Sequence, residues 1–148
     1  MLKCIFHTLI FSFIFIITSY SNEIKITSDE LEIDRLNKLS IFKGNVYVYD
    51  NDLEIWSEKL IMSYNNSNKI QELHAEKNVK IKKESILARG DKGIYYPNIE
   101  ALEIFGSVEV RENNNLVICD ELFLDIKNST SIMSSRSSGR VEAYIVNN

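Results

Sequence analysis

Two short motifs recur four times along this chain, and the phase between them is the feature that most constrains its fold. In the first motif a small or polar pair precedes a valine; the four valines are Val46, Val79, Val108 and Val141. In the second motif an acidic residue opens an apolar run; the four acids are Asp29, Glu58, Asp91 and Asp120. Each acid precedes its valine by 17 or 21 residues, in strict alternation. This phasing predicts a stack of four similar structural units.

Apolar and polar residues alternate around these anchors, as in residues 46–49, 79–82, 108–111 and 141–144. A period of two is typical of half-buried strands. The asparagine-rich segments between the periodic runs favour turns, and no segment after residue 21 keeps a helical period for three turns. We therefore predict an all-β domain.

The apolar parity changes inside each unit. Leu53, Ile55 and Ser57 fall on odd positions, whereas Leu60 and Met62 fall on even ones. A strand that keeps its apolar side inward across such a change needs a bulge or a corner, and the repeated acids are expected to serve those bulges. The small residues at the place of Ser57 in later units are Gly90 and Cys119. The simplest architecture is two antiparallel sheets that face each other, with unpaired strand edges at both ends of the stack.

Residues 1–21 have the pattern of an export signal. A lysine near the start is followed by an apolar core of about 14 residues and by small residues before a predicted cleavage site after Ser21. The core is shorter than the roughly 20 residues that span a bilayer; a retained anchor is the alternative. Residues 22–148 then form a single exported domain whose one cysteine, Cys119, is expected to be a buried structural thiol.

The composition of residues 22–148 argues against several functions. They carry 16 Lys and Arg against 21 Asp and Glu, a net charge of −5. This balance disfavours nucleic acid as a partner, because phosphate binding needs a cationic surface. The one histidine, His74, lies in an alternating segment typical of an exposed strand, and no nucleophile, zinc or phosphate-loop motif accompanies it. We expect no enzyme activity, no cofactor and no metal site.

The repeat resembles a known family. The segments FKGNVYV at residues 42–48 and LEIWSEKL at 53–60, with GSVEV at 106–110 and DELFLD at 120–125, resemble the OstA-like domain of the LptA family. The resemblance covers roughly residues 24–145. It implies a twisted two-sheet β-jelly roll, also called a β-taco, and a periplasmic protein that bridges the inner and outer membranes of a Gram-negative bacterium for lipopolysaccharide. The implied partners are lipopolysaccharide, LptC-like and LptD-like domains joined by strand addition, and further copies of the chain joined head to tail.

In this family the apolar interior takes the acyl chains of lipid A. Burial alone stabilises an acyl chain by roughly 0.8 kcal/mol per CH₂, without a sharply defined site. By parity, the interior residues expected to line the lipid groove are Leu31, Ile33, Val46, Val48, Leu60, Met62, Val79, Ile81, Tyr95, Ile104, Val108, Val110, Leu122 and Leu124.

Two other interpretations stay open at this point. An LptC-like member of the same transport system would keep residues 4–20 as a membrane helix. A structural or adhesive β-repeat protein would bind strand edges and no lipid, and its interior would be filled by its own side chains.

Overall fold

The computed structural model describes residues 23–136 and 139–147, so the predicted signal peptide lies outside the described residues. The strands are β1 (Lys25–Thr27), β2 (Glu30–Asp34), β3 (Leu39–Asp50), β4 (Leu53–Tyr64), β5 (Ile70–Lys83), β6 (Ile86–Tyr96), β7 (Ala101–Glu112), β8 (Asn115–Asp125), β9 (Thr130–Ser134) and β10 (Glu142–Tyr144). In these two stretches there is no helix long and apolar enough to cross a membrane. The prediction of an all-β domain is confirmed.

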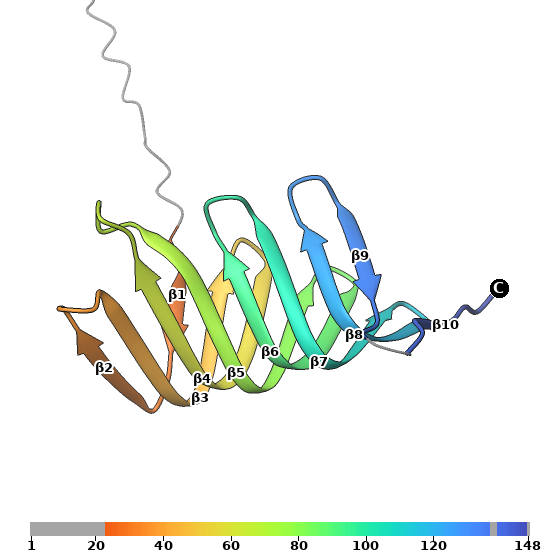
Figure 1. Cartoon of the computed structure of the whole chain (residues 1–148), viewed down its shortest axis with the longest axis horizontal. Coiled ribbons are helices and arrows are strands. Elements are labelled where there is room, and N and C mark those ends of the chain that lie inside the picture. The colour runs from red at the N-terminus through yellow and green to blue at the C-terminus, as the bar shows by residue number, and fades with distance from the viewer. Residues whose placement is uncertain (1–22, 137–138, 148) are drawn as a thin grey trace, which may run out of the picture.

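All ten strands belong to one antiparallel sheet that does not close on itself (Figure 1). From β3 to β8 each strand pairs with the next along the chain. At the first end, β1 and β2 both pair with β3, and at the other end β9 and β10 both pair with β8. The stack therefore ends in two short strands on each side.

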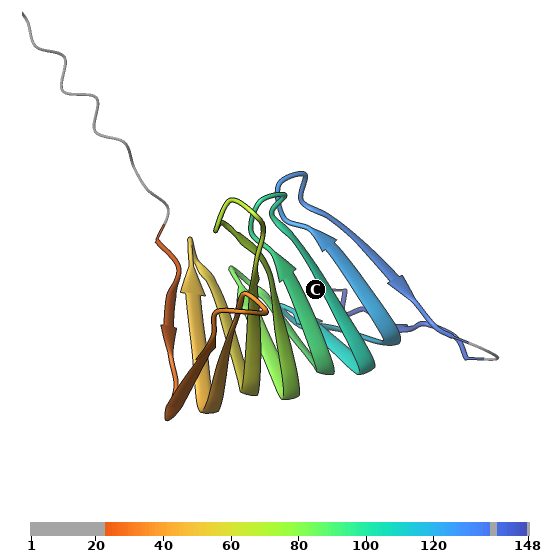
Figure 2. The same ribbon diagram turned by 60° about the vertical axis from the view of Figure 1, so that its left-hand side comes forward.

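Every pairing between β3 and β8 shifts register at the same level of the sheet. On β3, β5 and β7 the shift falls at two consecutive residues with positive φ: Gly44 and Asn45, Lys77 and Asn78, Gly106 and Ser107. These bulges bend all the long strands along one line, which we call the corner (Figures 1 and 2). The predicted corner is confirmed, and the two facing sheets are halves of one continuous hydrogen-bonded sheet.

The corner divides the sheet into two half-sheets. Half-sheet A contains β2, β9 and residues 39–43, 59–64, 70–76, 92–96, 101–105 and 121–125. Half-sheet B contains β1, β10 and residues 46–50, 53–57, 79–83, 86–90, 108–112 and 115–119. Their inner faces enclose one hydrophobic core, to which both contribute. The fold is therefore a V whose interior is apolar.

The repeated acids lie at the corner, as expected. Asn45 Nδ2 donates a hydrogen bond of 2.8 Å to Asp29 Oδ2, and Asn78 Nδ2 donates one to the Glu58 carboxylate. In the last unit, the backbone N–H of Arg136 donates to Asp120 Oδ2 at 2.8 Å. The carboxylates of Asp29 and Glu58 thus bind the asparagine side chains of the neighbouring bulges, and that of Asp120 binds the backbone just after β9.

Candidate functional site

Twelve of the fourteen residues predicted for the interior are buried in the core between the half-sheets. Half-sheet A supplies Leu60, Met62, Tyr95, Ile104, Leu122 and Leu124. Half-sheet B supplies Val46, Val48, Val79, Ile81, Val108 and Val110. Strand parity therefore assigned these side chains to the correct face.

Leu31 and Ile33 differ from the other twelve, because 51% and 60% of their surfaces are exposed. Their cross-strand partners, Phe42 and Ser40, are buried on the inner face of β3, so both residues also face the interior. They lack cover because β2 is an edge strand and β1, on half-sheet B, is only three residues long. Both residues thus lie on the inner face that parity predicted, and the interior is open at this end.

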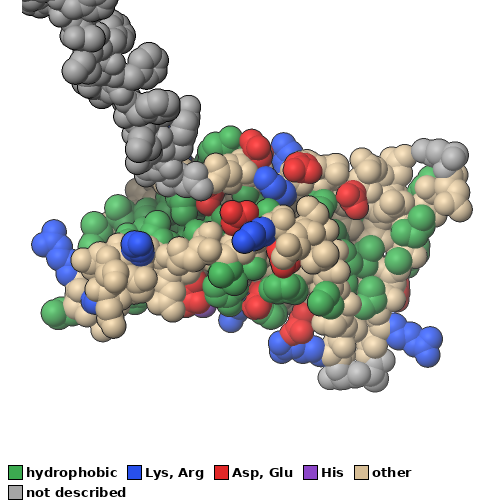
Figure 3. Space-filling model, turned by 90° about the horizontal axis from the view of Figure 1, so that it is seen from above, with side chains coloured by type: hydrophobic (Ala, Val, Ile, Leu, Met, Phe, Trp, Pro, Cys, Tyr) green, Lys and Arg blue, Asp and Glu red, His purple; other side chains and the backbone are tan. Residues whose placement is uncertain are grey.

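The other end of the interior is open as well. Ala143 of β10 pairs with Val117 on the inner face of β8, and Ala143 is exposed. Val141 and Ile145 are both exposed. Seen from above, the molecule also has hydrophobic surface at the end that carries β1 and β2 (Figure 3). A continuous apolar interior thus reaches the surface at both ends of the stack.

Several interior residues were absent from the predicted groove lining: Phe42, Leu53, Ile55, Leu73, Ala88 and Leu102. Only Leu102 shares a half-strand with a predicted groove residue, Ile104, two positions away. The other five lie on half-strands for which no groove residue was predicted. The thiol of Cys119 is buried at the corner, and burial raises its pKa. A protonated, buried thiol fits the structural role expected for this cysteine.

The two half-sheets touch across the middle of the interior. A Cβ atom added to Gly93, on half-sheet A, would lie 3.2 Å from Val79 Cγ1 and 3.5 Å from Ile81 Cδ1, on half-sheet B. At the corner, a Cβ atom on Gly90 would lie 2.5 Å from Ile104 Cγ2. Glycine at these positions lets the facing surfaces pack at core density. In this structure the central interior is filled by its own side chains.

The free margins of the half-sheets, opposite the corner, also meet. We call the contact between them the lip. Tyr95 of β6 donates a hydrogen bond of 2.8 Å from its hydroxyl to Asp50 Oδ2 of β3, and both residues are buried. Asn51 Nδ2 donates a second bond of 2.9 Å to Asp50 Oδ1. Two cavities, of about 260 and 510 Å³, adjoin this pair and are lined by residues of both half-sheets.

Burial and the neighbouring Asp50 carboxylate raise the pKa of the Tyr95 phenol well above its ordinary value of 10.0. The unfolded chain therefore releases this proton at a lower pH than the folded chain does. The stabilising contribution is complete below pH 10 and is lost as the pH rises above it, by about 1.4 kcal/mol per pH unit. We expect Tyr95→Phe to reduce the slope of unfolding free energy against pH between 10 and 11.5, measured by urea denaturation. An unchanged slope would show that Tyr95 titrates normally.

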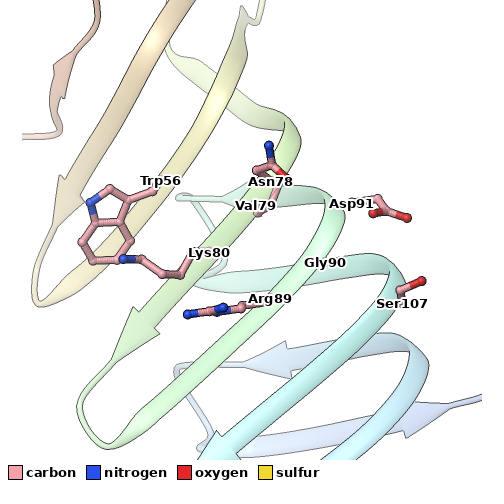
Figure 4. A pocket seen from close by; sticks show the side chains of 8 residues that line it. All are labelled: Trp56, Asn78, Val79, Lys80, Arg89, Gly90, Asp91 and Ser107. Atoms are coloured by element: carbon pink, nitrogen blue, oxygen red, sulfur yellow. The ribbon is translucent and has the colours of Figure 1, made fainter.

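A pocket of about 420 Å³ lies outside the interior, on the outer side of half-sheet B near the corner. Trp56, Lys80 and Arg89 project to the same side from β4, β5 and β6 (Figure 4). Lys80 Nζ lies 3.8 Å from the centroid of the Trp56 ring, in a cation–π contact. Tyr47 packs on the same indole, with 5.4 Å between ring centroids. The indole therefore packs against Tyr47 and Lys80 of the same half-sheet.

His74 is partly exposed on half-sheet A, where its Nε2 lies 3.0 Å from Glu72 Oε1. Its nearest neighbours across the sheet are Ile61 and Ile94. No nucleophile lies among these partners, so the pair is a surface contact of the strand. This matches the exposed strand position predicted for the histidine.

Comparison with known proteins identifies the fold. Residues 25–130 match the family model described as LptA/(LptD N-terminal domain) LPS transport protein. The crystal structure of LptH, the LptA homologous periplasmic component of the conserved lipopolysaccharide transport device from Pseudomonas aeruginosa, aligns with a TM-score of 0.76 and 11% sequence identity. The alignment covers 85% of this chain and 96% of LptH. No curated protein matches the sequence.

Proposed function

The chain belongs to the LptA/LptD N-terminal domain family of lipopolysaccharide transport proteins, and we propose that it is a periplasmic carrier that shields lipid A acyl chains between its two half-sheets. The observation that carries this proposal is the apolar interior, which runs the length of the stack and reaches the surface at both ends. Once the half-sheets move apart, such an apolar interior suits an elongated apolar cargo handed from one domain to the next.

The acyl chains would replace contacts that the half-sheets now make with each other. Val79 and Ile81 approach Gly93 across the interior, so a chain can enter only when the half-sheets move apart. Separation costs buried area, and the acyl chain offsets that cost at roughly 0.8 kcal/mol per CH₂. The site therefore needs no fixed polar geometry, in keeping with an interior made almost wholly of aliphatic residues.

The unpaired edges supply the partner surfaces in this proposal. Half-sheet A ends in β2 and β9, and half-sheet B ends in β1 and β10. Edge strands offer free backbone N–H and C=O groups for strand addition. Because the two ends are not equivalent, copies joined head to tail form an open filament, and LptC-like and LptD-like domains would extend the same sheet. The filament would bridge the two membranes.

The structural β-repeat alternative predicts a filled interior, as the structure has at its centre, but it gives no reason for two open apolar ends. The LptC-like alternative depends on whether residues 4–20 stay attached. Mass measurement of the protein purified from a bacterial periplasm separates these cases: cleavage after Ser21 supports the carrier, and an intact segment supports the anchored component.

Native mass spectrometry of residues 22–148 with purified lipopolysaccharide tests the proposal. We expect one lipid-sized adduct per chain, together with a ladder of oligomers whose population grows with protein concentration. Oligomers without an adduct at any lipid concentration would favour the structural β-repeat protein instead.

A further inference from the structure

The hydrogen bond between Tyr95 and Asp50 connects the two half-sheets at the lip. Among the residues that the structure describes, it is the only side-chain hydrogen bond that joins half-sheet A to half-sheet B away from the corner. The two residues are 45 positions apart in the chain, and two strands separate β3 from β6 in the sheet. The contact therefore forms only when the two half-sheets of the V are close together, and the pairing of neighbouring strands does not produce it.

The environment of the pair makes this bond selective for the closed state. Asp50 is one of three buried polar or charged residues in the described chain, and it lies at the margin of an otherwise aliphatic core. A buried carboxylate must keep its hydrogen-bond donors, because an unpaired one is strongly disfavoured in an apolar interior. When the lip opens, water can take the place of the Tyr95 hydroxyl. The pair thus stabilises closure without preventing opening.

The cavities beside the pair add a second observation. One is lined by Asp50, Leu53 and Lys83 of half-sheet B and by Asn51 of the turn after β3, together with Tyr95, Glu100 and Ile126 from the opposite margin. The other extends along the lip toward Ile24 and Ile70. Packing along the lip is therefore incomplete on both sides of the hydrogen bond, in contrast with the filled centre of the interior.

We propose that Asp50 and Tyr95 form a latch that holds the two half-sheets closed over the interior and that must part for an acyl chain to enter. This inference rests on the proposed function. The latch acts at the lip, between β3 and β6, whereas the open strand edges serve assembly. Cargo entry and filament formation are then separable: a protein locked at the lip still assembles, but it takes up no lipid.

A reversible cross-link tests the latch. In a Cys119→Ser background, Asp50→Cys and Tyr95→Cys are introduced together and bridged by a short bis-methanethiosulfonate reagent; serine is the residue that the first unit carries at the place of Cys119. We expect the bridged protein to lose lipopolysaccharide binding by at least tenfold and to regain it when a reductant removes the bridge. Lipid uptake by the bridged protein at the unbridged level would overturn the proposal.

The matched control is a bridge within one half-sheet. Lys59 and Glu76 are direct cross-strand partners on half-sheet A, and their side chains form an ion pair of 3.1 Å. Bridging Lys59→Cys to Glu76→Cys should leave lipopolysaccharide binding unchanged, because it does not join the two half-sheets. Loss of binding in this control would attribute the effect to the reagent and would count against the latch.

A second variant weakens the latch without a reagent. Tyr95→Phe removes the hydroxyl and should speed lipid uptake by roughly tenfold, the factor expected for losing a hydrogen bond to a charged group. Tyr64→Phe is the control, because its hydroxyl bonds Ser40 at 3.3 Å within half-sheet A alone. Equal uptake rates for the two variants would contradict the latch.

Hydrogen exchange without lipid separates failure of the latch from failure of the proposed function. Tyr95→Phe should accelerate exchange at the lip in β3 and β6, and Tyr64→Phe should not. Accelerated exchange with no lipid adduct in any variant would support the latch as a device of the fold and refute the lipid cargo. Unchanged exchange with normal lipid binding would refute the latch and leave the proposed function standing.

Discussion

Aspartate in place of Val48 is expected to lower the free energy of unfolding by about 4 kcal/mol or more and to reduce lipopolysaccharide binding below detection. Val48 is almost fully inaccessible in the core of half-sheet B, between Ile26 on β1 and Ile55 on β4. An ionised carboxylate there has no donor to satisfy it, and a buried unpaired charge is among the few single changes with so large an effect. Since domains of this size are stable by only about 5–15 kcal/mol, such a loss removes a large share of the free energy of unfolding.

The neighbouring position supplies the control for this change. Tyr49 follows Val48 in β3 but points outward, with 40% of its surface exposed. Tyr49→Asp should change stability by less than about 1 kcal/mol and leave lipid binding intact. Urea denaturation and native mass spectrometry on both variants give the two readouts. If Val48→Asp stays folded and still binds lipopolysaccharide normally, the interior does not hold the acyl chains.

Valine in place of Gly106 is expected to lower the free energy of unfolding by about 3 kcal/mol, for two independent reasons. Gly106 has φ of +80°, a left-handed conformation that a β-branched residue avoids. A Cβ atom at this position would also overlap the carboxylate of Asp91. Both costs fall on the corner, which aligns the inner faces of the half-sheets. Thermal or urea denaturation measures the change, and a loss under 1 kcal/mol would show that the corner tolerates side chains at Gly106.

The equivalent position of the second unit, Lys77, allows the reverse substitution, which is expected to raise the free energy of unfolding. Lys77 takes the place of Gly106 there with φ of +65°, and its acidic neighbour is Glu58 instead of aspartate. The longer side chain of glutamate sets its carboxylate farther from its own backbone, which leaves room for a Cβ atom at Lys77. Lys77→Gly removes left-handed strain and should stabilise the protein by up to about 1 kcal/mol. Destabilisation by this change would contradict the strain argument.

The corner and the inner faces could be predicted from the sequence because both depend on patterns among residues close together in the chain. The change of parity between Ser57 and Leu60 requires a bulge, and the phased acids mark where each bulge falls. Continuity of the sheet around the corner has no such signature, since hydrogen bonding between strands does not depend on side-chain identity. For this reason the sequence predicted two facing sheets, whereas the structure has one sheet folded at the corner.

The alternation of apolar residues also could not predict how far the side chains at the ends of the stack are buried. Parity places Leu31 and Ile33 on the inner face, but it cannot tell whether another strand covers them. The latch was hidden for a different reason. Asp50 precedes the tight turn at Asn51 and Asp52 and is indistinguishable there from a turn residue, and Tyr95 appears as one more apolar strand position. Only the closed V brings the two side chains together.

Photo-cross-linking to lipopolysaccharide tests most directly the claim that the interior carries the cargo. A photoreactive phenylalanine analogue replaces Phe42 or Met133, which face the interior near its two ends, and Tyr49 or Phe123, which lie on the outer face. The prediction is that lipopolysaccharide is captured from the two inner positions and not from the two outer ones. Capture from the outer positions at an equal or greater yield would contradict it.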